Sequence, residues 1–73
     1  NASTRLQYRL DQNADVALEV RDIAGKLVTQ ITRGTQAPGY HSITLDVTQY
    51  NAGVYMTTLV VNGARATERL LVD

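Results

Sequence analysis

The fold is indicated most clearly by the stretch NAGVYMTTLVV, which occupies residues 51–61. Its first residues, Asn51 to Gly53, are typical of a tight turn, because Asn and Gly tolerate the positive φ that a chain reversal needs. The run from Val54 to Val61 carries no charge and is rich in β-branched residues. Such a run is typical of a strand that is apolar on both faces. We therefore expect residues 54–61 to form the central strand of an antiparallel sheet.

Further strands are predicted on both sides of this stretch. Residues 4–10, 16–22 and 40–47 alternate apolar and polar side chains, as half-buried strands do. The apolar residues of 27–33 keep no clean period of two, which predicts a bulge or an edge position. Residues 64–72 complete a set of six strands joined by short turns. This spacing predicts an all-β fold, a small immunoglobulin-like antiparallel β-sandwich of six to seven strands.

Two turns have specific signals. Gly25 lies in the loop Asp22–Lys26, at the position that needs a positive φ. Asn62-Gly63 predicts a two-residue hairpin turn of the primed type. A seventh strand is expected either upstream of Asn1 or in the loops. Because the chain begins without Met, we interpret residues 1–73 as one domain excised from a longer protein.

Composition excludes several classes of function. The chain of 73 residues has no Cys, which rules out disulfides and zinc–thiolate sites. Seven basic and seven acidic residues give a formal net charge of zero, whereas binders of nucleic acid carry a basic excess. No apolar run approaches the roughly 20 residues that span a bilayer. We therefore expect no nucleic-acid partner and no direct membrane insertion.

No catalytic or metal-binding constellation is evident. His41 is the single His, and the neighbouring Ser42 points to the opposite face of its strand, so we interpret His41 as a rim residue hydrogen-bonded near a loop. Asp11, Asn13 and Asp15 have the spacing that opens a calcium loop, but later ligand and glycine positions do not match, which favours a plain polar turn. We expect no catalytic residue, no metal and no cofactor.

One face of the predicted central strand could remain uncovered. Val54, Met56 and Val60 are expected to point away from the core, whereas Tyr55 and its alternating neighbours face it. An exposed apolar patch at those three residues could dock a partner or form a homodimer. Charged residues on the last strand, by contrast, are interpreted as protection of a sheet edge.

Short motifs follow one another in order along nearly the whole chain. They are Leu6-x-Tyr8-x-Leu10, Val16-x-Leu18-x-Val20-x-Asp22-x-x-Gly25-Lys26-x-Val28-x-x-Ile31, Gly39-Tyr40-His41, Gly53-Val54-Tyr55 and Arg69-Leu70-Leu71-Val72. In order and spacing this set resembles the C-terminal sorting domains of the type IX secretion system, of type A.

This resemblance implies that residues 1–73 are the C-terminal sorting domain of a longer secreted protein, which is an address label and not an enzyme. The domain would direct a cargo protein through the periplasm and the outer-membrane translocon of a Gram-negative bacterium to the cell surface. A sortase-like peptidase would then usually remove it. The partners implied are the components of the type IX translocon and that peptidase. Recognition by the translocon is expected at Lys26, Arg69, Leu70, Leu71 and Val72.

The family's other motif residues are expected mainly to serve the fold. They are Gly25, Gly39, His41, Gly53 and Tyr55.

Two alternative functions stay open. The flagellar hook-capping protein has a similar small β domain with comparable Asp-x-x-Gly and Gly-x-Tyr patterns, which favours a structural or assembly module. An accessory carbohydrate- or protein-binding domain of a secreted hydrolase would need exposed aromatic residues, for which Tyr40 and Tyr50 are the candidates.

Overall fold

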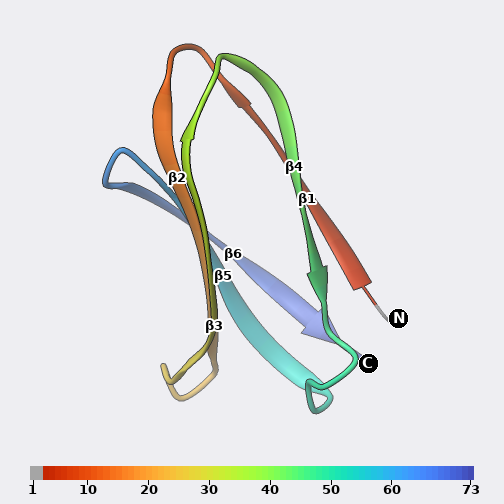
Figure 1. The fold of residues 1–73 in the computed structure, drawn as a ribbon. Coiled ribbons are helices and arrows are strands. Elements are labelled where there is room, and N and C mark those ends of the chain that lie inside the picture. Colours follow the sequence, from red (N-terminus) through yellow and green to blue (C-terminus); the bar gives the residue numbers. More distant parts are fainter. Residues whose placement is uncertain (1–2) are drawn as a thin grey trace.

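Six β-strands make up most of residues 3–73, which are the residues described by the computed structural model (Figure 1). In chain order they are β1 (Ser3–Leu10), β2 (Ala14–Asp22), β3 (Leu27–Gln36), β4 (Gly39–Asp46), β5 (Gly53–Val61) and β6 (Ala64–Val72). All six predicted strands are present, and the described residues contain no helix that could cross a bilayer.

The strands form two sheets of unequal width. The small sheet contains β1 and β4, and the large sheet has the order β3-β2-β5-β6. Every pair is antiparallel, so the predicted antiparallel sandwich is confirmed. The stretch that begins at Gly53 becomes β5, which lies between β2 and β6, as expected for a central strand.

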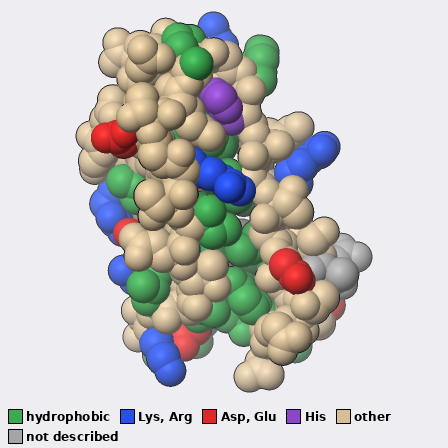
Figure 2. Space-filling view, viewed as in Figure 1, with side chains coloured by type: hydrophobic (Ala, Val, Ile, Leu, Met, Phe, Trp, Pro, Cys, Tyr) green, Lys and Arg blue, Asp and Glu red, His purple; other side chains and the backbone are tan. Residues whose placement is uncertain are grey.

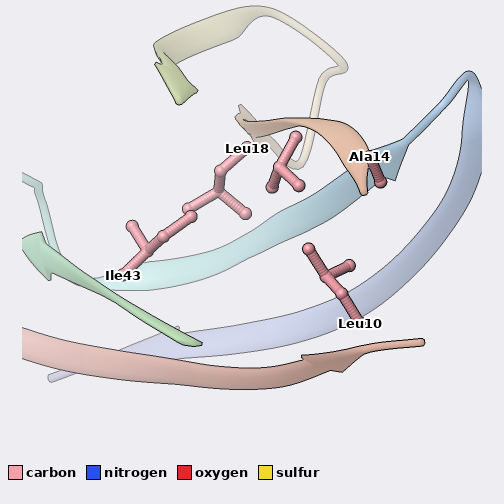
Figure 3. Packing of buried hydrophobic residues seen from close by; sticks show 5 residues of the cluster. Leu10, Ala14, Leu18 and Ile43 are labelled. Atoms are coloured by element: carbon pink, nitrogen blue, oxygen red, sulfur yellow. The ribbon is translucent and has the colours of Figure 1, made fainter. Parts of the chain in front are cut away.

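The core lies between the sheets, because alternate residues of each strand point inward. A first buried cluster joins β2 to the small sheet and contains Leu18 and Ile43, both 0% exposed (Figure 3). A second cluster fills the other end of the sandwich and contains Val20, Leu45, Val47, Tyr55 and Val72. Since two strands cannot cover four, hydrophobic side chains remain visible in the furrow between the sheets (Figure 2).

The hairpin between β5 and β6 has the predicted turn. Asn62 and Gly63 both have positive φ, 48° and 84°, which is the signature of a type I′ turn. The turn is also tied to the start of β2, where the Asn62 amide donates to the Asp15 carbonyl at 2.9 Å. The Asp15 amide in turn donates to Asn62 Oδ1 at 2.8 Å. These bonds fix the turn against the neighbouring strand.

β3 is irregular and lies at an edge of the large sheet, which confirms both predictions for that stretch. Its register with β2 shifts between Val16 and Ala17 and again between Val20 and Arg21. Such shifts place two residues opposite one and bend the strand. Pairing with β2 resumes beyond the shift between Val16 and Ala17. β3 therefore continues to Gln36, past the expected end at residue 33.

The connection from β4 to β5 is closed by a tyrosine. The Tyr55 hydroxyl donates to the carbonyl of Asn51 at 2.7 Å, and the ring packs on Tyr50 with centroids 5.0 Å apart. Immunoglobulin-like sandwiches use this arrangement, in which a tyrosine near the start of a strand bonds back to the preceding corner. Tyr55 therefore fixes the path by which the chain crosses from the small sheet to the large one.

Replacing Leu18 with Ala should destabilise the domain strongly. Leu18 is fully buried, so the change removes apolar contact and leaves a cavity, at a cost of about 2–5 kcal/mol. Chemical denaturation followed by circular dichroism measures this loss. The control is Ile23→Ala, because Ile23 is 81% exposed and should change the free energy of unfolding by less than about 0.5 kcal/mol. Equal effects of the two changes would contradict the assigned core.

Replacing Tyr55 with Phe tests the corner bond alone. The ring stays in the core, but the hydrogen bond to Asn51 is lost, which should lower the free energy of unfolding by about 1 kcal/mol. The matched control is Tyr40→Phe, since the Tyr40 side chain is 85% exposed. Thermal denaturation of both variants is the measurement, and a neutral Tyr55→Phe would refute a structural role for the hydroxyl.

Candidate functional site

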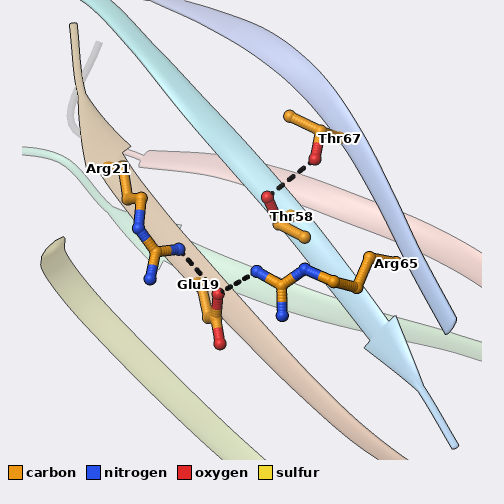
Figure 4. A network of polar contacts seen from close by, with 5 residues as sticks. All are labelled: Glu19, Arg21, Thr58, Arg65 and Thr67. Atoms are coloured by element: carbon orange, nitrogen blue, oxygen red, sulfur yellow. Dashed lines mark hydrogen bonds and ion pairs between the residues drawn. The ribbon is translucent and has the colours of Figure 1, made fainter. Parts of the chain in front are cut away.

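A polar network lies on part of the outer face of the large sheet (Figure 4). It contains Glu19 and Arg21 on β2, Thr58 on β5, and Arg65 and Thr67 on β6. The strand register explains the grouping, because Glu19 pairs with Thr58 and Thr58 pairs with Thr67 in one row across three strands. Residues in such a row share a face of the sheet.

One carboxylate oxygen organises this network. Glu19 Oε1 accepts hydrogen bonds from the guanidinium groups of Arg21 and Arg65, each at 2.6 Å. Arg65 reaches Glu19 across β5. The hydroxyls of Thr58 and Thr67, on the same face of the sheet, share a hydrogen bond of 2.8 Å. The ion pairs thus link β6 to β2, two strands that make no direct ladder with each other.

The network shifts the titration of Glu19. Hydrogen bonds from Arg21, and then from Arg65, favour the ionised carboxylate and lower its pKa below the usual 4.5, although partial burial opposes the shift. The pKa of Asp46 is lowered as well, because its carboxylate accepts hydrogen bonds from the backbone amide and then from the hydroxyl of Thr48. Both carboxylates therefore stabilise the fold in their charged form.

The residues expected to meet a translocon are not gathered on one surface. Leu70 and Val72 point inward and pack in or against the second core cluster. Arg69 and Leu71 point outward, and Leu71 is 68% exposed. Lys26 lies in the turn between β2 and β3, where its amide donates to Asp22 Oδ1 at 2.9 Å. The C-terminal strand is therefore divided between core and surface.

Most of the remaining motif residues have structural roles. Gly25 has φ of 89° in the β2–β3 turn, whose amides are held by the carboxylate of Asp22. Gly39 and Gly53 begin β4 and β5. Their positions agree with the expectation that the motif mainly serves the fold.

His41 is held between a strand and a loop, as expected of a rim residue. Its ring stacks on Tyr8 with centroids 5.5 Å apart, and Nε2 donates to the carbonyl of Ala37 at 2.7 Å. Ser42 points to the other face of β4, so the two side chains cannot act as a pair.

The acidic residues that follow β1 have protein partners. Asp11 pairs with Arg9 at 3.2 Å, and the Asp15 carboxylate accepts a hydrogen bond from Thr35 at 2.6 Å. Within residues 3–73 no three His, Cys, Asp or Glu side chains converge as metal ligands do.

The apolar residues of β5 point as expected. The register places Val54, Met56 and Val60 on the outer face of the large sheet, opposite Leu71, Arg69 and Arg65 of β6. Arg65 and Arg69 flank Met56 and Val60, so the outer face combines apolar and basic side chains.

The Glu19 network was missed by sequence reasoning. The structure places Arg65 and Arg69 on one face of β6 and Glu68 on the opposite face. The alternation of β6 could have revealed this, since residues 65, 67 and 69 share one face and residue 68 does not. To predict that Arg65 pairs with Glu19, one also needs the register of β2, β5 and β6. The alternation of side chains along one strand does not give that register.

Comparison with known proteins identifies the family of the chain. The family model described as the FlgD Ig-like domain matches residues 1–64. The crystal structure of FlgD from P. aeruginosa superposes with a TM-score of 0.61 at 23% identity, covering 94% of this chain and 59% of that chain. At this identity the superposition shows the fold alone, and it confirms the predicted immunoglobulin-like architecture. No curated protein matches the sequence.

These findings correct the resemblance to type IX sorting domains, which was wrong. The secretion function inferred from it, and the translocon and sortase-like peptidase as partners, are wrong with it. The physical reason is that the motifs mostly specify a fold. Gly25 makes a turn, Tyr55 closes a corner, and Leu70 and Val72 fill the core, so any small sandwich of this topology needs similar residues at these positions.

Replacing Glu19 with Gln should change how stability depends on pH. Because the folded-state pKa of Glu19 is lowered, its contribution is complete above the unfolded pKa of about 4.5 and is lost as the pH falls through the folded value. Wild type should therefore exceed Glu19→Gln in free energy of unfolding at pH 6, and the difference should shrink toward pH 3. Asp46 is present in both proteins, so its contribution cancels.

Urea denaturation at a series of pH values measures this difference. Gln12→Ala, an exposed change that introduces no titrating group, should differ from wild type by a constant amount over the same range. A Glu19→Gln difference that is equally constant would argue against the ion network.

Proposed function

The chain belongs to the FlgD Ig-like domain family, and we propose from this that it is a non-catalytic assembly module of a FlgD-like flagellar hook-capping protein. The observation that carries the proposal is the family match over residues 1–64, which includes five complete strands and the turn into the sixth. The chain spans 59% of the length of the P. aeruginosa FlgD chain. That it contributes to the activity of a whole hook-capping protein is therefore our proposal.

The distribution of polar groups supports a structural role. The polar cluster around Glu19 joins three strands through ion pairs and hydrogen bonds. His41 is occupied by Tyr8 and Ala37, away from the hydroxyl of Ser42. Such groups hold surfaces in place and do not pair a nucleophile with a base, which supports a non-catalytic module.

The hydrolase-accessory alternative receives less support. Of its two candidate aromatics, Tyr50 donates to Thr29 at 3.0 Å and packs against the second core cluster. Tyr40 is exposed, but the Arg9 guanidinium lies 5.9 Å from its ring centroid. The cell-surface location was implied only by the resemblance to sorting domains; no contact among the described residues tests it, and it stays a prediction.

Deleting the codons for residues 3–72 from the gene that encodes this chain tests the proposal. A bacterium that needs the module should then form few or no complete hooks and lose motility, because the capping protein would lack one of its assembly surfaces. Electron microscopy of hooks and swimming in soft agar are the measurements.

The matched control carries Gln12→Ala in the same gene and should assemble normal hooks. Normal hooks in the deletion strain would overturn the proposal, provided that immunoblotting shows the shortened parent protein at its usual level. A deletion that leaves hooks intact but abolishes the display of an attached enzyme would instead point to a targeting role.

A further inference from the structure

The small sheet has an open edge at β1. This strand pairs with β4 in an unbroken register from Ser3 opposite Asp46 to Leu10 opposite Gly39. Within residues 3–73 no strand pairs with its other side. The backbone groups on that side of an extended strand are a ready template for a further strand.

The inner face of β6 lies across the sandwich from this edge and is largely uncovered. Ala64, Ala66 and Glu68 belong to the inward-facing set, because they pair with inward-facing residues of β5, yet all three are exposed. Further along the same face Leu70 is half-buried and Val72 is buried. The two-stranded small sheet is thus too narrow to cover the inner face of β6.

The opposite side of the sandwich is bridged by tyrosines. Tyr8 donates to Gln36 of β3, and Tyr50 donates to Thr29 of β3 at 3.0 Å. Ile31 of β3 packs against both core clusters. Because Tyr8 belongs to β1 and Tyr50 to the connection between β4 and β5, these two segments cover the inner face of β3, whereas much of the inner face of β6 is exposed.

Hollows mark both ends of the gap between β1 and β6. A depression of ≈ 590 Å³ lies between the end of β1 and the β5–β6 hairpin, and its lining includes Leu10, Val61 and Ala64. A smaller one of ≈ 90 Å³ lies between Thr4 and the end of β6. Open space beside β6 is therefore present at both ends of β1.

The charges beside this gap specify what can fill it. The outward-facing residues of β1 include Arg5 and Arg9, and within the described residues the nearby acidic partner of Arg9 is Asp11, at 3.2 Å and exposed. Residues of an added strand that lie opposite these arginines share their face, where opposite charges stabilise the pairing. The outward positions of the incoming strand should therefore be acidic.

A second copy of the chain does not meet this requirement. Its own β1 would bring Arg5 and Arg9 beside the same two arginines on one continuous face. Two other edge strands have an unbroken register. β6 turns Arg65 and Arg69 outward, and β4 turns outward a single carboxylate, Asp46, which already accepts two hydrogen bonds from Thr48. Like charges placed opposite each other in a sheet are destabilising.

We propose that β1 is a strand-addition site for an extended segment of a partner protein, in which apolar residues that face β6 alternate with acidic residues that face outward. The small side chains of Ala64 and Ala66 leave room for large apolar ones, and the neighbouring Glu68 is exposed. This proposal rests on the sheet topology and goes beyond the assembly role, so it can fail or hold independently of that role.

Synthetic peptides test the proposal on the 73-residue chain. One eight-residue peptide alternates Glu with Val or Ile, and a matched peptide has Lys in place of Glu. Fluorescence anisotropy of labelled peptides gives affinity, and amide hydrogen exchange gives the position. The acidic peptide should bind about tenfold more tightly than the basic one and should protect amides of β1.

Charge reversal supplies the sharper test. In the double variant Arg5→Glu, Arg9→Glu, the preference should invert in favour of the Lys peptide. Both side chains are exposed, and circular dichroism checks that the fold is kept. The control is Arg69→Glu, which reverses an exposed charge on the outer face of the other sheet and should leave the preference unchanged.

Several results would overturn the proposal. They are equal affinities for the two peptides, protection confined to β3 or β6, an inversion caused by Arg69→Glu, or a dimer with protected β1 amides in the absence of peptide. If the double variant fails to fold, the salt dependence of wild-type binding decides. The preference of the wild-type chain for the acidic peptide must weaken as the salt concentration is raised, because salt screens exposed charge pairs.

Discussion

The packing of β4 across β2 is the constraint on which this structure depends. Leu18 and Ile43 come from different sheets, are fully buried and lie in one cluster, so they hold together sheets that share no hydrogen-bond ladder. A chain of 73 residues has little surplus core, since small domains bury a modest share of their surface. The narrow sheet must therefore sit over the centre of the wide one, and the margins of the wide sheet remain open as a consequence.

Local patterns predicted the strands because each pattern has a local physical cause. Alternation over residues 16–22 reports one buried face, and the Asn62-Gly63 pair reports a turn that needs two positive φ values. The pairing order of the strands is a different matter. Nothing in the sequence of β1 states that it pairs with β4 while β2 pairs with β5, because this depends on how hairpins stack around a shared core. The width of each sheet, and hence the open edge, follows from that order.

The candidate site was harder to predict for the same reason. Arg65 and Glu19 are 46 positions apart and meet through a register that involves three strands. The residues that sequence reasoning selected for recognition, such as Leu70 and Val72, were chosen because their motif resembled a family pattern. In the structure Val72 is buried and Leu70 is half-buried, because apolar residues at the end of a last strand pack into the core of a sandwich of this kind. A motif made of core and turn residues identifies a fold and does not by itself identify what the fold binds.

The two outer faces of the sandwich differ in how their charges are balanced. On the large sheet Glu19 accepts hydrogen bonds from two arginines, so much of that face's charge is used in linking its own strands. On the small sheet Arg9 pairs with Asp11, but this pair is exposed and therefore weak, and the outward row of β1 itself contains no carboxylate. A charge that is paired within the fold contributes little to a new contact, because forming the contact would first have to break the pair. Stability and recognition are therefore separated: the wide sheet supplies a fixed frame, and the narrow sheet keeps both an unpaired backbone edge and cationic side chains available to a partner.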